Sequence, residues 1–198
     1  MRVLSAGLVL VALCAPQAMA QEGRWGVKGG VNFATVSSDD EPDIPFDYRI
    51  GLVAGGFFTW PIGSHLDIQP EALYSQQGTT LDVLGVDSAI KTDYLATPIL
   101  VRYRLQSSSR GLVLFAGPSL GFKLSAKAVS EFGDVTTKDD IGDEIESFDY
   151  GVVFGAGWEA GRLMIDGRYT WGLSNMSARE DDPKTQHRVI SVLAGVRF

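Results

Sequence analysis

The side chains best suited to acid–base chemistry in this sequence are its two histidines, His65 and His187. A histidine activates a serine hydroxyl for acyl transfer when a carboxylate orients the imidazole ring. Ser177 and Ser191 lie near His187 in the sequence. However, the sequence has neither a His-x-Ser spacing nor a strand–turn–helix elbow that would expose a serine. We therefore expect no catalytic residues.

Thiol and metal chemistry are also poorly supported. The single cysteine, Cys14, lies in an apolar run near the N-terminus. The net charge of -7 makes the chain a poor nucleic-acid binder. Carboxylates crowd two segments and could bind divalent cations there, but the spacing in 139–144 does not match a calcium loop, so we expect no metal centre and no cofactor. These carboxylates are Asp39, Asp40, Glu41, Asp43, Asp47, Glu131, Asp134, Asp139, Asp140, Asp143, Glu144 and Glu146.

A further set of charged residues occurs at alternate positions within runs of alternating apolar and polar residues. Because both signs are present, these side chains could pair with one another in a narrow polar interior. The set comprises Lys28, Arg49, Asp67, Glu71, Arg102, Arg104, Lys123, Asp149, Glu159, Asp166, Arg168 and Arg197.

The alternation that positions these residues has a period of two, which indicates β-strands rather than helices. Only one apolar-face position carries a charge, Arg188. Eight runs follow one another, at 25–35, 48–60, 66–77, 94–105, 112–125, 148–160, 163–175 and 188–198. Pro70, Pro98 and Pro118 lie inside these runs, and because proline cannot donate to a ladder we expect each at a bulge or at the membrane interface.

The lengths of the connections indicate which face of the sheet meets lipid. Short connections (61–65, 106–111 and 161–162) alternate with long ones (36–47, 78–93, 126–147 and 176–187). Short turns on one side and long loops on the other are typical of outer-membrane barrels, in which apolar residues face lipid and polar residues face the interior. We therefore predict an all-β fold, an eight-stranded antiparallel up-and-down transmembrane β-barrel, with both termini in the periplasm.

Aromatic residues on the apolar face fall at the two ends of the strands, as interfacial girdles do. The predicted girdle residues are Trp25, Trp60, Tyr103 and Trp158 at the short-turn end and Tyr48, Tyr74, Tyr150 and Trp171 at the long-loop end. The chain ends on a further apolar-face aromatic residue, Phe198, as outer-membrane assembly signals do.

The first twenty residues are expected to be a cleaved secretion signal. Arg2 precedes an apolar run at 3–15, and Ala18-Met19-Ala20 fits a small-x-small cleavage site. The apolar run is too short to span a bilayer as a helix, which needs about 20 residues. We predict a signal peptide at 1–20 and an outer-membrane β-barrel at 21–198.

Several strand sequences resemble the PorT-like outer-membrane β-barrel family, often described as porin family proteins. The resemblance implies a fold and a location in the outer membrane, with no defined reaction. The matching stretches are Ile68–Tyr74 (IQPEALY), Tyr94–Leu100 (YLATPIL), Phe115–Gly121 (FAGPSLG), Phe154–Gly157 (FGAG), Arg168–Asn175 (RYTWGLSN) and Gly195–Phe198 (GVRF).

An eight-stranded barrel has an interior about wide enough for side chains to fill. We therefore expect a structural or surface-interaction protein with acidic extracellular loops. A narrow ion or small-solute channel is the alternative, and a lipid A-modifying enzyme using His187 is a third possibility. Expected partners are outer-membrane lipid, lipopolysaccharide, the barrel-assembly machinery and an extracellular protein or surface ligand.

Overall fold

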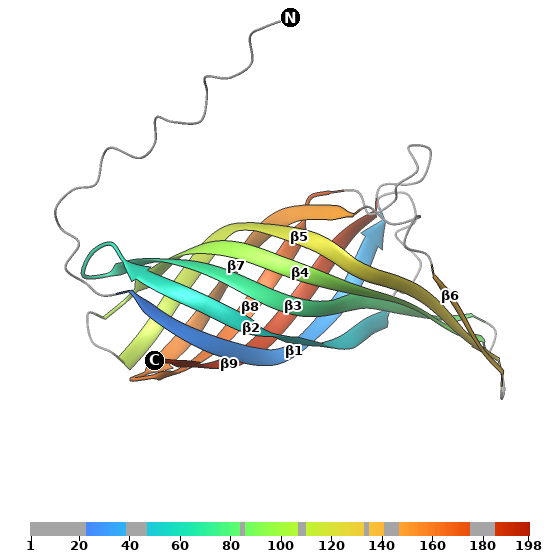
Figure 1. The fold of residues 1–198 in the computed structure, drawn as a ribbon, viewed down its shortest axis with the longest axis horizontal. Helices are drawn as coiled ribbons and strands as arrows, with labels where there is room; N and C mark the ends of the chain where they lie inside the picture. Colours follow the sequence, from blue (N-terminus) through green and yellow to red (C-terminus); the bar gives the residue numbers. More distant parts are fainter. Residues whose placement is uncertain are drawn as a thin grey trace, which may run out of the picture.

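The computed structural model describes residues 23–38, 47–83, 86–106, 110–132, 135–140, 147–174 and 185–198. No described segment is a helix long and apolar enough to cross a membrane. The described elements are all strands (Figure 1): β1 (Arg24–Ser38), β2 (Asp47–Pro61), β3 (Leu66–Val83), β4 (Val86–Arg104), β5 (Arg110–Phe132), β6 (Val135–Asp140), β7 (Phe148–Ala160), β8 (Leu163–Gly172) and β9 (Thr185–Arg197).

The strands close into a barrel. Neighbouring strands pair antiparallel in the order β4-β3-β2-β1-β9-β8-β7-β5, and a further β4–β5 ladder completes the ring. The first and last strands meet along a seam in which Gly26 is the register partner of Arg197 and Val31 that of Val192. The structure therefore confirms the predicted eight-stranded antiparallel barrel. Of the described strands, β6 lies outside this ring and pairs only with the far end of β5.

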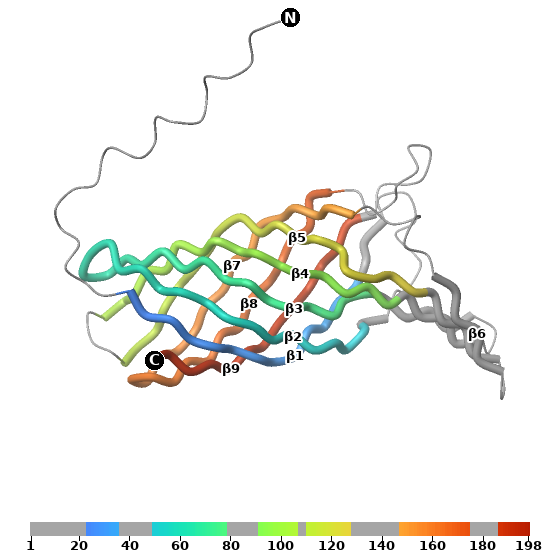
Figure 2. The backbone as a smooth tube through the Cα atoms, viewed as in Figure 1, coloured from blue at the N-terminus to red at the C-terminus, as the bar shows by residue number. Residues whose placement is uncertain are grey.

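Short turns gather at one end of the barrel, as the tube in Figure 2 shows. A two-residue turn, Gly161–Arg162, joins β7 to β8, and Gly161 has a φ of 66°, which tight hairpin turns need and glycine readily supplies. The C-terminus lies at the same end, because the Phe198 amide donates to the Trp25 carbonyl over 2.8 Å.

In two connections predicted as long loops, the described residues are instead paired as extended hairpins. In the first, β3 and β4 remain paired as far as Val83 and Val86. In the second, β5 runs on to Phe132, which is paired with Val135 of β6. Segments 78–93 and 126–147 are polar enough to suggest loops, but they also carry threonine and β-branched apolar residues, which favour extended backbone.

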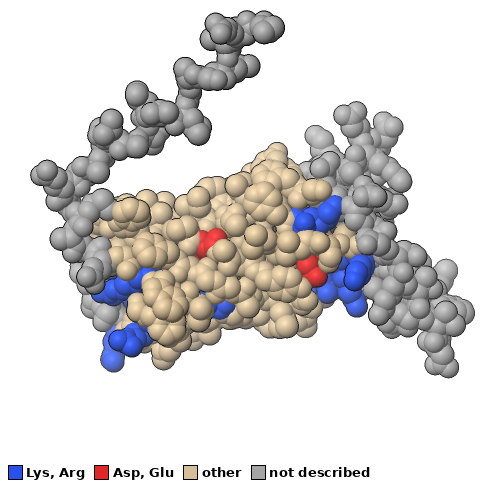
Figure 3. Space-filling model, viewed as in Figure 1, with Lys and Arg blue, Asp and Glu red and all other residues tan. Residues whose placement is uncertain are grey.

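Apolar side chains face outward and charged side chains face inward, as in a membrane barrel. Trp25 is 58% and Ile50 67% exposed, whereas Asp67 and Arg102 are completely buried. Apolar side chains therefore cover the outside and most strand charges lie inside, which confirms the predicted inversion relative to a soluble barrel. Figure 3 shows a broad uncharged surface with lysine and arginine gathered mainly toward its two ends.

The interior also contains apolar side chains that the alternation pattern did not indicate. Val53, Leu73 and Leu193 form one buried cluster. A second cluster comprises Leu100, Phe115 and Val153. The interior thus combines apolar packing with buried charge.

The prolines are accommodated without the expected bulges. Pro98 is the register partner of Ser119, and the β4–β5 ladder then skips to Val101 and Ala116, passing Pro118. The irregularities in register occur elsewhere, between Tyr48 and Val53 and between Asp93 and Tyr94. No register shift falls at Pro70, Pro98 or Pro118, so the bulge alternative is wrong for these prolines. Beside Pro98 and Pro118 the β4–β5 ladder is interrupted while the register is kept. The alternative, a position at the membrane interface, stays a prediction.

Candidate functional site

The charged side chains inside the barrel converge from strands that are far apart in the sequence. The Lys28 ammonium on β1 lies 2.8 Å from a carboxylate oxygen of Glu71 on β3 and 2.8 Å from one of Asp166 on β8. Arg168, also on β8, lies 2.8 Å from Glu71 and 3.0 Å from Asp166. Two cations and two carboxylates therefore form a closed group in which each charge contacts both opposite charges.

A second group of ion pairs continues from the first toward the short-turn end. Arg102 of β4 and Arg197 of β9 approach Glu159 of β7 at 2.9 and 3.4 Å, respectively. Arg104 lies 3.2 Å from Asp67, an ion pair by distance whose alignment falls short of a hydrogen bond. Both groups are buried except for the partly exposed Arg104 side chain.

Uncharged polar side chains connect the two groups. Arg102 donates to the amide oxygen of Gln69 over 2.8 Å, and the Gln69 amide nitrogen donates to Glu71 over 2.7 Å. The Thr59 hydroxyl also donates to the Gln69 oxygen, over 2.9 Å. We call the connected residues, together with the neighbouring Arg104–Asp67 ion pair, the lumen cluster, which comprises Lys28, Thr59, Asp67, Gln69, Glu71, Arg102, Arg104, Glu159, Asp166, Arg168 and Arg197. Thr59 and Gln69 were absent from the predicted charge network, although strand alternation places them on its face.

Aromatic rings and glycines shape the space around the lumen cluster. The Lys28 ammonium lies 4.8 Å from the ring centre of Phe57, and the Arg168 guanidinium 5.5 Å from that of Phe115. A Cβ atom at Gly157 would lie 2.4 Å from an Asp166 oxygen, and one at Gly155 would lie 2.8 Å from the Phe115 ring. Because Gly155 and Gly157 of β7 have no side chains, there is room beside them for the Phe115 ring and the Asp166 carboxylate.

Nearer the long-loop end, the interior is mostly uncharged and holds polar side chains beside the apolar cluster of Val53, Leu73 and Leu193. Asn32 donates to the Ser75 hydroxyl over 2.9 Å and accepts from the Ser191 hydroxyl over 2.8 Å. These residues and Arg168 line a small cavity of about 40 Å³, enough for a few water molecules.

The possible catalytic histidine has no serine partner among the described residues. The buried Nε2 atom of His187 lies 3.3 Å from the Tyr94 hydroxyl, while Ser191 is bonded to Asn32. Ser177 lies outside the described residues. His65, in the turn after β2, contacts the Arg104 carbonyl at 2.7 Å.

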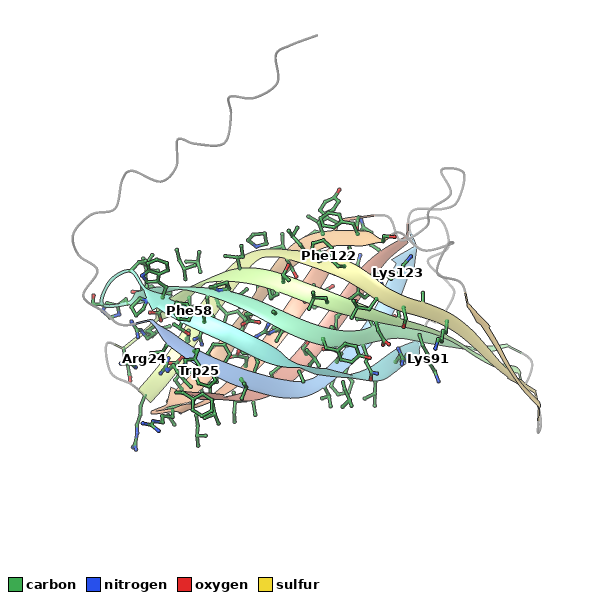
Figure 4. The ribbon with its side chains drawn as sticks, viewed as in Figure 1. Arg24, Trp25, Phe58, Lys91, Phe122 and Lys123 are labelled. Atoms are coloured by element: carbon green, nitrogen blue, oxygen red, sulfur yellow. The ribbon has the colours of Figure 1, made fainter. Side chains whose placement is uncertain are left out.

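Three predicted interior charges lie apart from the lumen cluster, nearer the long-loop end. Arg49 donates to the Gln77 carbonyl, and Asp149 accepts from the Ser174 hydroxyl. Lys123 is half-buried on β5, and Figure 4 shows it toward the long-loop end of the barrel. The carboxylates of the acidic segments lie outside the described side chains, and no group of potential ligands able to hold a metal ion is found among the side chains that are described.

The predicted girdle residues with described side chains are all exposed on the outer face. Those at the short-turn end are Trp25, Trp60, Tyr103 and Trp158, and those at the long-loop end are Tyr74, Tyr150 and Trp171. The Tyr48 side chain lies outside the described ones. The terminal Phe198 is also exposed, and its ring centre lies 4.4 Å from that of Trp25.

Comparison with known proteins places this geometry in a family. Residues 19–178 match the family model for the outer membrane protein beta-barrel domain. Among solved structures, Neisserial surface protein A is 13% identical, with 88% of this chain and 97% of that chain covered and a TM-score of 0.51. No curated protein matches the sequence.

Two further solved structures are similar over nearly their whole length. The attachment invasion locus protein Ail of Yersinia pestis is 15% identical, with 89% of this chain and 99% of that chain covered and a TM-score of 0.46. OprG of Pseudomonas aeruginosa is 12% identical, with 89% and 96% covered and a TM-score of 0.47. At these identities the structural comparisons bear on the fold alone.

Proposed function

Because the chain belongs to the outer membrane protein beta-barrel domain family, we propose that this small barrel of the bacterial outer membrane acts as a surface and structural protein with a closed interior, not as a pore or an enzyme. Its short turns face the periplasm and its long connections face outward, as in other outer-membrane barrels. We propose further that the chain is a PorT-like barrel, as the resemblance of its strand sequences suggests.

The observation that carries the proposal is the lumen cluster. Its ion pairs draw side chains from β1, β3, β4, β7, β8 and β9, so they reach across the interior from opposite walls. An ion crossing the barrel would have to break several buried ion pairs at once, and breaking one such pair costs about 3–5 kcal/mol. The closed interior leaves the exposed loops and the outer surface as the parts that interact with other molecules.

Conductance measurements in planar bilayers test the closed interior. The wild-type barrel is expected to show no stepwise conductance. The double substitution Arg102→Ser with Glu159→Ser removes one cation and one carboxylate from the cluster and should produce a small conductance. Arg110→Ser is the control: Arg110 lies at the short-turn end of the barrel but outside the lumen cluster, so this variant should stay closed. Steady conductance by the wild-type protein would instead favour the narrow-channel alternative.

The outer surface near the long-loop end carries a pair of lysines suited to lipopolysaccharide. Lys91 of β4 and Lys127 of β5 are register partners, and both are exposed. Like charges directly opposite one another destabilise a sheet unless an anion lies between them. Asp140 of β6 is the register partner of Lys127 in this row. Figure 4 shows Lys91 beyond Phe122 toward this end.

Lipopolysaccharide binding by the purified barrel tests this surface. Changing both Lys91 and Lys127 to Gln should weaken binding roughly tenfold at low salt, because each lysine near an anionic surface contributes measurably to attraction. Arg110→Gln, at the opposite rim, should leave the affinity unchanged. Equal affinity for the double variant and the wild type would show that the lysine pair does not contact the glycolipid.

Two further parts of the proposal concern partners. The exposed Phe198 at the end of β9, packed against Trp25 across the seam, suits recognition of the last strand by the barrel-assembly machinery. The hairpins β3–β4 and β5–β6 continue their pairing beyond the ring of barrel strands and could present a surface to an extracellular protein. No catalytic role is proposed, because the described residues offer no serine beside His187.

A further inference from the structure

The membrane-facing surface is hollowed where the first and last strands meet. An open groove of about 410 Å³ crosses β1, β9 and β8. Its outward-facing lining is entirely apolar, and it comprises Val27, Gly29, Leu163, Ile165, Ala194 and Val196. No other described segment of the chain covers this groove, so in the membrane it faces lipid.

The shape of the groove follows from the strand register. Val196 is the register partner of both Val27 and Leu163, so these three form one row across the strands. Ala194 is the partner of both Gly29 and Ile165, which form the next row toward the middle of the barrel. Because Gly29 has no side chain and Ala194 only a methyl group, they form the floor of the groove. The branched side chains beside them form the walls of the groove.

The groove lies near the short-turn end, where aromatic residues mark the membrane interface. Val196 lies two residues before Phe198, whose ring packs against that of Trp25. In the proposed orientation this end faces the periplasm, so the groove lies in the half of the barrel that spans the inner leaflet. That leaflet is built from glycerophospholipids, whereas lipopolysaccharide occupies the outer one.

Two exposed cations lie at the short-turn end, near the groove. Arg162 occupies the turn between β7 and β8, directly before Leu163, and its carbonyl accepts from the Arg197 amide over 2.8 Å. Arg24 begins β1 directly before Trp25, and Figure 4 shows Arg24 and Trp25 at this end of the barrel. Arginine binds phosphate oxygens through paired N–H groups.

We propose that this groove is a binding site for a glycerophospholipid of the periplasmic leaflet. One acyl chain would lie along the floor formed by Gly29 and Ala194, and the headgroup phosphate would contact Arg162 and Arg24. The combination of an apolar groove with cations at its interfacial end matches an amphipathic lipid. The site rests on the orientation given under Proposed function but not on whether the lumen is closed.

Native mass spectrometry of the full-length barrel, extracted from outer membranes in mild detergent, tests the proposal. The wild type is expected to retain a bound phospholipid. Ala194→Leu fills the groove and should reduce retention several-fold, whereas Ala116→Leu, the same change on the lipid-facing side of β5, should not. Gly29→Leu is a second groove-filling variant, since the nearest atoms to a Cβ there lie 3.6 and 3.7 Å away. Heat-dependent gel mobility would confirm that each variant is folded.

The headgroup contact has its own test. Changing both Arg24 and Arg162 to Gln should reduce phospholipid retention and remove its dependence on salt concentration, with Arg110→Gln as the control. The site would be disproved if Ala194→Leu and Gly29→Leu retained as much phospholipid as the wild type. Lipopolysaccharide in place of phospholipid, or a second copy of the chain released by Ala194→Leu, would also overturn it. A lumen that conducts, with phospholipid still retained, would contradict only the proposed closed interior.

Discussion

Replacing Glu71 with Ala is expected to lower the free energy of unfolding by about 3–5 kcal/mol. The Glu71 side chain is completely buried and lies within 2.8 Å of both Lys28 and Arg168. It also accepts a hydrogen bond from Gln69 over 2.7 Å. Its removal would leave two buried cations sharing Asp166 as their nearest carboxylate, and an uncompensated buried charge is costly.

Urea titration of the barrel in lipid vesicles, followed by tryptophan fluorescence, measures this effect. Glu71→Gln keeps the shape and the hydrogen-bonding capacity but loses the charge, so its destabilisation should be intermediate. Asp93→Ala removes a half-buried carboxylate that accepts from Ser125 near the long-loop rim, and should cost about 1 kcal/mol or less. A Glu71→Ala barrel as stable as the Asp93→Ala barrel would show that the lumen cluster contributes little to stability.

The sequence could predict which face each cluster residue occupies, but not which residues meet. Alternation places Lys28, Glu71 and Asp166 inside, because an inward residue on one strand is followed by an outward one. Their contacts depend on how far each strand is displaced along its neighbour when the ring closes. Lys28 reaches Asp166 across 138 positions of sequence, and no local pattern encodes that distance.

The sequence pattern also failed to indicate the apolar side chains inside the barrel. Phe57 and Phe115 are inward residues in the structure, buried beside the cations of the lumen cluster. In the sequence, each lies in a run where apolar residues occupy both faces, so the period of two is locally hidden. The glycines paired with them, Gly26 of β1 with Phe57 and Gly155 of β7 with Phe115, were a usable signal, since small residues facing large ones are common inside small barrels.

The extended hairpins were not predicted, for a different reason. Charge and glycine in 78–93 and 126–147 suggested loops, whereas backbone pairing continues well past the point where apolar alternation stops. The apolar period reports burial in lipid, so it ends at the membrane surface. Strand pairing has no such requirement, because antiparallel ladders also form in water. The predicted strand ends therefore mark the membrane boundary better than they mark the ends of β3, β4 and β5.

Closure of the barrel should depend strongly on Gly30, because β1 and β9 approach each other closely there. A Cβ atom at Gly30 would lie 1.9 Å from the backbone carbonyl oxygen of Val192. That atom belongs to the neighbouring strand and cannot rotate away, so Gly30→Ala must push β1 from β9 or distort both. Overpacking typically costs about 1–3 kcal/mol, and we expect the upper end of that range or more at this seam.

Gly56→Ala is the matched control, because its Cβ would lie 3.7 Å from the nearest atom, the carbonyl oxygen of Gly26. Folding of both variants into lipid vesicles, followed by heat-dependent gel mobility, separates the two cases. Gly56→Ala should fold with wild-type yield, whereas Gly30→Ala should fold slowly and leave a large unfolded fraction. Because the first and last strands can pair only after the intervening strands are in place, the defect should appear late, as an open sheet that fails to close. Wild-type folding by Gly30→Ala would mean that the seam tolerates a wider spacing than the structure shows.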